Sequence, residues 1–304
     1  MDKQGTCTDT RCADAPAASG PYADGPCAGE QSLGHDWQPP RLDTSLPHPG
    51  RMFNYMIGGK DNFRVDRDAV GQLVRARPDT VMTARAKESF IRRSVVALAE
   101  AGLRQFIQFG QSITFVGSGG HAALWAAADL RSVVYVADDP ISLAHARALL
   151  ADRPGSPVAV VDGDFRDPER VLADPRVAGR IDPAEPVGLL LFGMLDFIAS
   201  DRRARRALDY LLRIAAPGSM AAVVHITEVE SESVNNAMDA ALSRNEIELI
   251  PRSPEHVRDL MSGYRFLDPG LVPIVTWRPD PDDDGPGPEM AARTGALGGV
   301  ICVD

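Results

Sequence analysis

Glycine and polar residues follow successive apolar runs of this 304-residue chain, and their types suit a nucleoside-like ligand. Gly110 follows the first run, and Asp138 and Asp164 follow the next two. A glycine lets the backbone approach a nucleotide closely, while carboxylates accept hydrogen bonds from ribose hydroxyls or an adenine amino group. Asp196 follows the fourth run and His225 ends the fifth, so both are candidate groups for proton removal.

Each candidate also has a purely structural interpretation. Asp139, which follows Asp138, is a suitable helix N-cap, and Asp164 is able to hold a turn through its side chain. Asp196 can equally cap its own segment. A lone histidine such as His225 is more often a satisfied structural residue than a base.

The loop after the first run is an incomplete nucleotide-binding turn. Ser112 stands where a second glycine would help after Gly110, although Gly117–Gly120 offers further backbone N–H groups. On its own, this loop is as consistent with a surface loop as with a ligand cradle. In the loop after the fourth run, we expect Met194 to close over the reacting end of the ligand.

Alternating strands and helices must bring these residues together. The expected strands are Gln105–Phe109, Ser132–Val136, Val158–Val161, Val187–Phe192 and Met220–Ile226. The expected helices between them are Gly120–Ala128, Pro140–Ala151, Pro168–Ala173 and Asp201–Ala215, with Asp139 and Asp201 as N-caps. This alternation predicts a parallel, doubly wound α/β sheet, in which ligands bind at the carboxyl ends of the strands.

The beginning of the chain departs from this alternation. Residues 1–40 are rich in small and polar residues and predict a disordered tail. An extended lead-in, Asp43–Pro49, then precedes two helices, Val65–Ala76 and Thr83–Ala101. We therefore expect a helical cap over residues 41–104.

The remaining residues, 105–304, are expected to form the sheet domain. Near its end, Leu271–Trp277 and Val300–Val303 read as strands that are joined by a polar insert rather than by a helix. Such a connection predicts an antiparallel addition at the edge of the sheet. A helix from Ser253 to about Met261 precedes these strands.

Composition disfavours several classes of partner. Thirty-two Lys and Arg against 42 Asp and Glu give a net charge of −10, which argues against a nucleic-acid backbone as the main partner. No apolar run approaches the roughly 20 residues that span a bilayer, and no hydrophobic block marks a secretory signal. The four cysteines have no metal-ligand spacing and read as reduced thiols of a cytoplasmic protein.

A long set of spaced residues resembles the actinobacterial family of S-adenosylmethionine-dependent methyltransferases that carry an N-terminal GGKDN motif. That motif corresponds here to Gly58, Gly59, Lys60, Asp61 and Asn62. Further matching residues include Pro47-His48, Arg51, Tyr55, Arg92-Arg93, Gly110, Asp139-Pro140, Asp164, Arg166-Asp167-Pro168, Pro217-Gly218 and Pro269–Pro273. The resemblance extends from about Asp43 to the C-terminus.

The resemblance implies a class I methyltransferase fold, which is Rossmann-like, with a seven-stranded sheet whose last strand is antiparallel. It implies S-adenosylmethionine as cofactor, in a pocket roofed by the GGKDN segment. It also implies methyl transfer to a small-molecule acceptor, with secondary metabolism as the setting of the reaction. Asp196 and His225 are then the candidates for removing a proton from that acceptor.

Three departures from the family pattern support a second hypothesis. Gln108 replaces an acid, Ser112 replaces a glycine, and Ala137 replaces the carboxylate after the second strand, while Asp196 stands where a histidine is common. Charge-assisted hydrogen bonds contribute about 1.5–3 kcal/mol each, so cofactor affinity could fall roughly ten- to a hundredfold. The alternative is a methyltransferase-like protein that no longer methylates: a cyclase, an isomerase, or a ligand-binding or scaffold protein.

Overall fold

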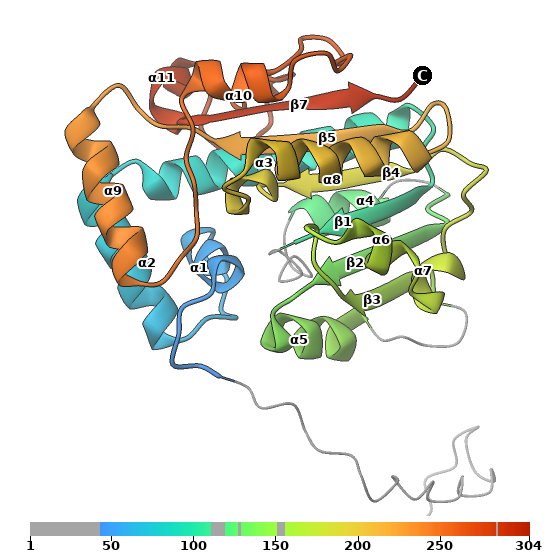
Figure 1. Ribbon diagram of the computed structural model, residues 1–304, viewed down its shortest axis with the longest axis horizontal. Helices are drawn as coiled ribbons and strands as arrows, with labels where there is room; N and C mark the ends of the chain where they lie inside the picture. Colours follow the sequence, from blue (N-terminus) through green and yellow to red (C-terminus); the bar gives the residue numbers. More distant parts are fainter. Residues whose placement is uncertain (1–42, 111–118, 127–128, 151–155, 284) are drawn as a thin grey trace, which may run out of the picture. The chain divides into compact units, whose positions relative to one another are not determined.

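Residues 43–110, 119–126, 129–150, 156–283 and 285–304 are described by a computed structural model. They contain a seven-stranded sheet in the order β3-β2-β1-β4-β5-β7-β6, in which β7 is antiparallel to its neighbours β5 and β6 (Figure 1). The strands are β1 Gln105–Phe109, β2 Ser132–Ala137, β3 Val158–Asp162, β4 Gly188–Phe192, β5 Met220–Ile226, β6 Val272–Pro273 and β7 Ala296–Cys302. The predicted fold class, with its antiparallel last strand, is confirmed.

The register of the parallel strands brings the predicted loops to one edge. Phe109, the last residue of β1, pairs with Val136 of β2 and with Leu191 of β4. The chain builds outward from β1 to β3 and then crosses to β4 on the other side of β1. The loops after β1 and β4 therefore diverge at this point, which is where open α/β sheets bind ligands.

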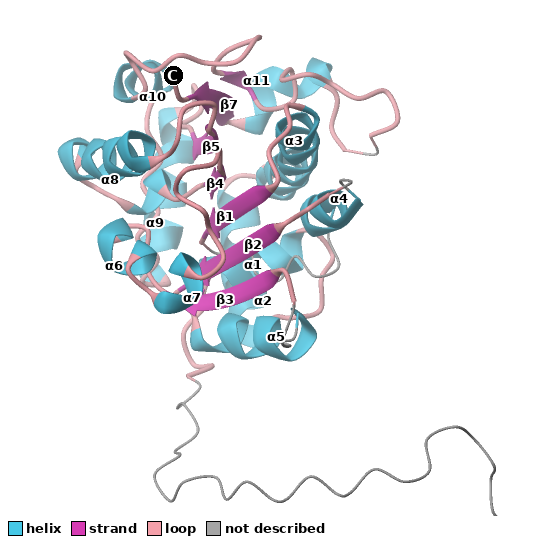
Figure 2. Ribbon diagram, turned by 90° about the vertical axis from the view of Figure 1, so that its right-hand side faces the viewer, coloured by secondary structure: helices cyan, strands magenta, loops and turns pink. Residues whose placement is uncertain are grey.

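Helices cover both faces of the sheet (Figure 2). The helices are α1 Pro49–Met56, α2 Arg64–Ala76, α3 Thr80–Glu100, α4 Gly119–Ala126, α5 Pro140–Leu150, α6 Pro168–Leu172, α7 Pro175–Ala178, α8 Asp201–Ile214, α9 Glu232–Arg244, α10 Pro254–Leu260 and α11 Ala291–Thr294. Buried residues of α3, α4 and α5 share one core with the sheet, and those of α6, α7, α8 and α10 share a second. A third core joins α1, α2 and α9, which lie side by side at the left of Figure 1.

Four helices were not expected from the sequence: α1, α9 and the four-residue helices α7 and α11. The prolines before residue 50 suggested extended chain, but Pro49 occupies the first turn of α1, where a missing N–H costs nothing. His48 caps that helix by accepting a hydrogen bond from Gly50 N. Helix α9 was missed because only Ala241 and Leu242 of its thirteen residues are buried, which leaves a weak apolar stripe.

Several predicted boundaries also change. Ser200, rather than Asp201, caps α8 by accepting from Arg203 N, because two neighbouring residues were both competent to cap. Only Val272–Pro273 of the expected Leu271–Trp277 strand is paired, and β7 begins at Ala296. The other strand positions are confirmed within one residue at each end.

The predicted helical cap and sheet domain share one core. Phe90 of α3 packs edge-on against Trp277, with ring centroids 5.3 Å apart, and against Phe192 of β4 at 6.5 Å. Residues 41–304 accordingly form one unit. The expected tail, Ser112 and Gly117 lie outside the described residues. Among the described helices, none has both the length and the apolarity needed to cross a bilayer.

Candidate active site

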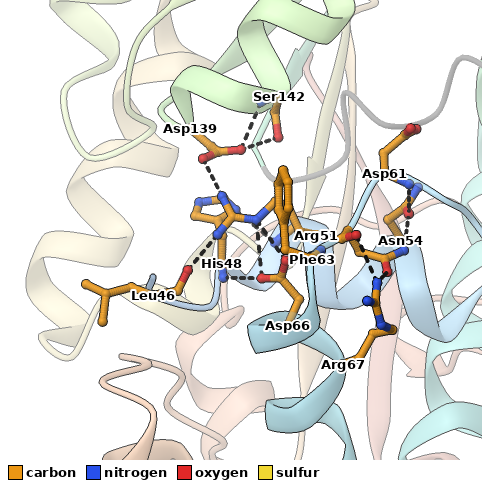
Figure 3. A network of polar contacts seen from close by, with 12 residues as sticks. Leu46, His48, Arg51, Asn54, Asp61, Phe63, Asp66, Arg67, Asp139 and Ser142 are labelled. Atoms are coloured by element: carbon orange, nitrogen blue, oxygen red, sulfur yellow. Dashed lines mark hydrogen bonds and ion pairs between the residues drawn. The ribbon is translucent and has the colours of Figure 1, made fainter. Parts of the chain in front are cut away.

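A buried arginine fixes the N-terminal helices against the sheet (Figure 3). Arg51 of α1 is 2 % exposed, and its Nε donates to Asp66 of α2 at 3.0 Å. Its Nη1 donates to Asp139 Oδ1 at 2.9 Å, and its Nη2 donates to Leu46 O. Asp139 also caps α5 by accepting from Ser142 N at 2.9 Å. The predicted cap role of Asp139 is confirmed, and the same carboxylate anchors α1.

The GGKDN segment forms a turn around the side chain of Asn54. Asn54 Oδ1 accepts from Asp61 N at 2.9 Å and from Asn62 Nδ2 at 3.0 Å (Figure 3). A Cβ on Gly59 would lie 2.2 Å from Asn54 Nδ2, so only glycine fits there, and Gly58 has a φ of +88°. Lys60 is exposed. Its predicted place as a roof over the cofactor stays a prediction, because neither cavity described below is lined by the segment.

Four of the predicted cofactor residues meet in one cleft at the carboxyl edge of the sheet, which we call the edge cleft. These four are Gly110, Asp138, Asp164 and Met194. The edge cleft has a volume of about 280 Å³, near the lower end of the roughly 300–1,000 Å³ of typical ligand pockets. Further lining comes from His48, Phe165, Phe197, Ile247 and the exposed carboxylates Glu246 and Glu248.

The two aspartates of the edge cleft differ in how their carboxylates are engaged. Asp138 has a side chain that is 52 % exposed, and its Oδ1 lies 3.8 Å from His48 Nε2. Asp164 is bound to Arg166, which donates from its backbone N at 2.7 Å and from Nη2 at 2.6 Å. Asp138 is therefore open to a ligand, while the turn-holding interpretation of Asp164 also holds.

Gly110 and Met194 are in tight contact across the floor of the edge cleft. Gly110 has a φ of +96°, and a Cβ built there would lie 2.0 Å from Met194 Cε. Glycine is thus required by both conformation and space. Phe165 forms an apolar wall nearby, held edge-on against Phe109 with centroids 5.6 Å apart.

A second, smaller cavity lies beneath the N-terminal helices, and we call it the inner cavity. Its volume is about 100 Å³. Most of its lining is apolar and comes from α1, α2 and α9, namely Met52, Phe53, Met56, Leu73, Met238 and Leu242. Three charged residues, Arg77, Lys87 and Asp196, interrupt this lining. Pro49, Phe197 and Ile247 line both cavities, so the two are neighbours.

Asp196 is held from behind by the backbone and lies beside His225. Ile226 N donates to Asp196 Oδ1 at 3.1 Å, and His225 Nδ1 lies 2.9 Å from the same oxygen. Arg252 Nη1 lies 2.8 Å from His225 Nε2. Because a guanidinium only donates, we assign Nε2 as the acceptor and place the ring proton on Nδ1, which donates to Ile226 O at 2.7 Å. Both ring nitrogens of His225 are therefore engaged, Nδ1 by the backbone and Nε2 by Arg252.

The opposite carboxylate oxygen, Asp196 Oδ2, is buried and has no hydrogen-bond partner among the described residues. Leaving a buried acceptor unsatisfied costs about 1–3 kcal/mol, so such an atom points to a missing partner. Lys87 of α3 is close by, over the Phe53 ring with Nζ 5.1 Å from its centroid. Burial lowers the pKa of the Lys87 ammonium, while the carboxylates of Asp196 and Glu88 act in the opposite direction.

The sequence profile of a family described as S-adenosyl methyltransferase matches residues 35–302. The chain belongs to the S-adenosyl methyltransferase family. The fold agrees with this family, since a solved structure of a proposed methyltransferase from Thermobifida fusca superposes with a TM-score of 0.76. It is 30 % identical to this chain, and the match covers 88 % of this chain and 99 % of that one.

A second similar structure is a DUF574 family protein from Streptomyces avermitilis. It has a TM-score of 0.78 and 28 % identity, and the match covers 87 % of this chain and all of that chain. No curated protein matches the sequence. Family membership therefore rests on the profile and on these structures.

The edge cleft suits the adenosyl part of this family's cofactor. Asp138 presents a carboxylate for ribose hydroxyls, and Phe165 and Ile247 provide apolar surface for a base. Asp138 thus takes the place expected of the residue at position 137, because Ala137 is buried in the core and only 2 % exposed. The sequence did not indicate Lys87, since nothing in its local pattern distinguishes an inward polar residue from a surface one.

Proposed function

We propose that this protein binds S-adenosylmethionine in the edge cleft and methylates a small-molecule acceptor held in the inner cavity. The observation that supports this most directly is the wall shared by the two cavities, formed by Pro49, Phe197 and Ile247. Methyl transfer needs the acceptor in direct contact with the methyl group, so the two ligands must occupy neighbouring spaces. We place the reaction in the secondary metabolism of an actinobacterium, the setting that the sequence resemblance implies.

The residues of this chain would then bind, orient and accept a proton. When bound, the cofactor supplies a methyl group that its sulfonium makes electrophilic. Asp138 would hold the ribose, and Met194 over Gly110 would form the floor beneath the reacting centre. Asp196 lines the inner cavity, and its unpartnered Oδ2 would accept a proton from the acceptor, while Ile226 N holds the carboxylate through Oδ1.

A methyltransferase-like protein that no longer methylates is the second candidate. Gln108 and Ala137 support it, since both replace acids of the family pattern. The engagement of Asp164 by Arg166 supports it further, because a bound adenine would have to share that carboxylate. Such a protein would retain the inner cavity and use it for another reaction or for binding alone.

Isothermal titration with S-adenosylhomocysteine separates these candidates. We expect binding by the natural protein, at an affinity that Asp138→Asn lowers about tenfold or more through loss of a charge-assisted hydrogen bond. Mass spectrometry of protein purified from cells should detect a bound S-adenosyl compound. Binding that appears only after Ala137→Asp would instead favour the non-methylating candidate.

A further inference from the structure

The glycine that follows β4 lets two oppositely charged side chains approach the same stretch of backbone. A Cβ on Gly193 would lie 2.6 Å from Lys87 Nζ and 3.0 Å from Asp196 Oδ2. Gly193 has a φ of +79°, a conformation that other residues rarely adopt. Glycine at this position therefore allows both charged groups to lie against the backbone at the lining of the inner cavity.

Both groups are buried, since Asp196 is 0 % exposed and Lys87 is 9 % exposed. Asp196 Oδ2 has no hydrogen-bond partner among the described residues, and Lys87 Nζ lies over the face of the Phe53 ring. Two buried, oppositely charged side chains that line one cavity, with a carboxylate oxygen left unpartnered, indicate that a third group belongs between them.

The chemistry of that third group is restricted by its two neighbours. It must donate a hydrogen bond to Asp196 Oδ2 and accept one from Lys87 Nζ. A hydroxyl does both at once. A protonated amine has no acceptor for Lys87 and adds a second cation, while a carboxylate has no donor for Asp196 and adds a second anion.

The rest of the inner cavity sets the size and polarity of the molecule that carries this hydroxyl. Its lining is dominated by methionine, leucine and phenylalanine side chains, which favour an apolar body. At about 100 Å³ it is somewhat smaller than the roughly 150 Å³ apolar cavity that is known to bind benzene. One ring is therefore the largest body that this cavity could enclose.

We propose that the inner cavity binds a neutral hydroxylated compound with a single enclosed ring, a phenol or a close analogue, with its hydroxyl between Lys87 and Asp196. The role in catalysis rests on the proposed function, whereas the binding site rests on the inner cavity alone. Lys87 is then the residue that selects a hydroxyl over an amine as the methyl acceptor.

Every proton, bond and electron pair in methyl transfer to that hydroxyl can be accounted for. The hydroxyl proton passes to Asp196 Oδ2, and the oxygen forms a bond to the methyl carbon of S-adenosylmethionine. The carbon–sulfur bond breaks, its electron pair stays on sulfur, and the sulfonium becomes a neutral thioether. Lys87 stabilises the negative charge that develops on the oxygen as its proton leaves.

The test compares phenol, toluene and benzylamine as probes on the full-length protein, by ligand-observed NMR titration. We expect phenol to bind most tightly and benzylamine most weakly. Lys87→Met should weaken phenol about ten- to a hundredfold, because it removes a hydrogen bond to a charged group, and should change toluene by less than about threefold. Arg85→Met, on an exposed position of the same helix, is the matched control and should change neither.

Two results would overturn the proposal: equal phenol affinity for the natural protein and Lys87→Met, or tighter binding of benzylamine than of phenol. Thermal unfolding checks that each variant is folded, and Lys87→Gln takes the place of the methionine variant if that one is not. Titration of the same samples with S-adenosylhomocysteine tests the proposed function separately, since Lys87 does not line the edge cleft. Lysine-dependent phenol binding without nucleoside binding would support the hydroxyl site and reject the methyltransferase.

Discussion

Arg51 Nη1 lies 2.9 Å from Asp139 Oδ1, and this contact joins helix α1 to the loop that follows β2. The same guanidinium binds Asp66 through Nε, so one side chain holds two buried carboxylates. Asp139 directly follows Asp138, the carboxylate that is open to the edge cleft. The arginine therefore fixes the N-terminal helices and the neighbouring ligand-binding residue in one arrangement.

Removing this arginine should destabilise the fold strongly. Arg51→Met leaves Asp66 and Asp139 buried without their cation, so we expect a loss of about 3–5 kcal/mol in the free energy of unfolding. Urea denaturation measures this value. Arg64→Met removes an exposed arginine that pairs with Asp68 at 3.5 Å, and it should cost less than about 1 kcal/mol. Similar losses for both variants would contradict the structural role of Arg51.

Asp138 should govern the affinity for the nucleoside. We expect Asp138→Asn to weaken S-adenosylhomocysteine binding about tenfold or more, with little change in unfolding temperature, because its side chain is half-exposed and its contact with His48 is long, at 3.8 Å. Glu255→Gln on α10 is a suitable control, since that carboxylate is exposed and lies outside the edge cleft. An unchanged affinity would place the ribose elsewhere.

The free energy of unfolding should fall in mild acid because of the titration of His48. Burial lowers the pKa of His48 below its ordinary value of 6.5, and Arg51 acts in the same direction, whereas Asp138, Asp139 and Asp66 oppose them. A lowered pKa in the folded state gives stability that is complete above pH 6.5 and is lost as the pH falls through the folded value. Protonation of Nδ1 would also break the cap on Gly50 N.

Unfolding free energies between pH 5 and 7.5 test this dependence on the natural protein and on His48→Asn. Asparagine is a good N-cap that does not titrate in this range, so it should flatten the acid side of the curve. Parallel curves for the two proteins would assign the acid sensitivity to other groups.

Gly110 should tolerate no side chain. Gly110→Ala combines a left-handed conformation with a clash against Met194, so we expect a loss of about 1–3 kcal/mol in the free energy of unfolding. Adding Met194→Ala removes the clash but keeps the backbone strain. Once the separate cost of Met194→Ala has been subtracted, the double variant should therefore recover only part of the stability that Gly110→Ala loses. A double-mutant cycle measures this coupling.

Local sequence patterns predicted most of the sheet. The runs at Gln105–Phe109 and Met220–Ile226 have the predicted bounds, because central parallel strands are apolar on both faces and need no long-range information to be recognised. Helix α1 was hidden by Pro49, whose restricted φ suits both an extended chain and a first helical turn. Ser200 and Asp201 could not be separated because both are good capping residues.

The candidate site was less predictable than the fold. Gly110, Asp138, Asp164 and Met194 meet as expected, since each follows a strand and the register brings strand ends together. Nothing in the sequence singled out Lys87, because a lysine on a helix is usually solvated and only the packing of α3 against the rest of the fold turns it inward. Such inward polar residues depend on tertiary contacts that no short window of sequence contains.

Phe197 and Ile247 each border both cavities, so under the proposed function the same side chains would contact the cofactor and the acceptor. A substitution at either residue that enlarges one cavity would enlarge the other, and a new acceptor preference gained there would be accompanied by a changed affinity for the nucleoside. Leu73 and Met238 line the inner cavity and not the edge cleft. Descendants of this protein could therefore diversify their chemistry most freely from α2 and α9.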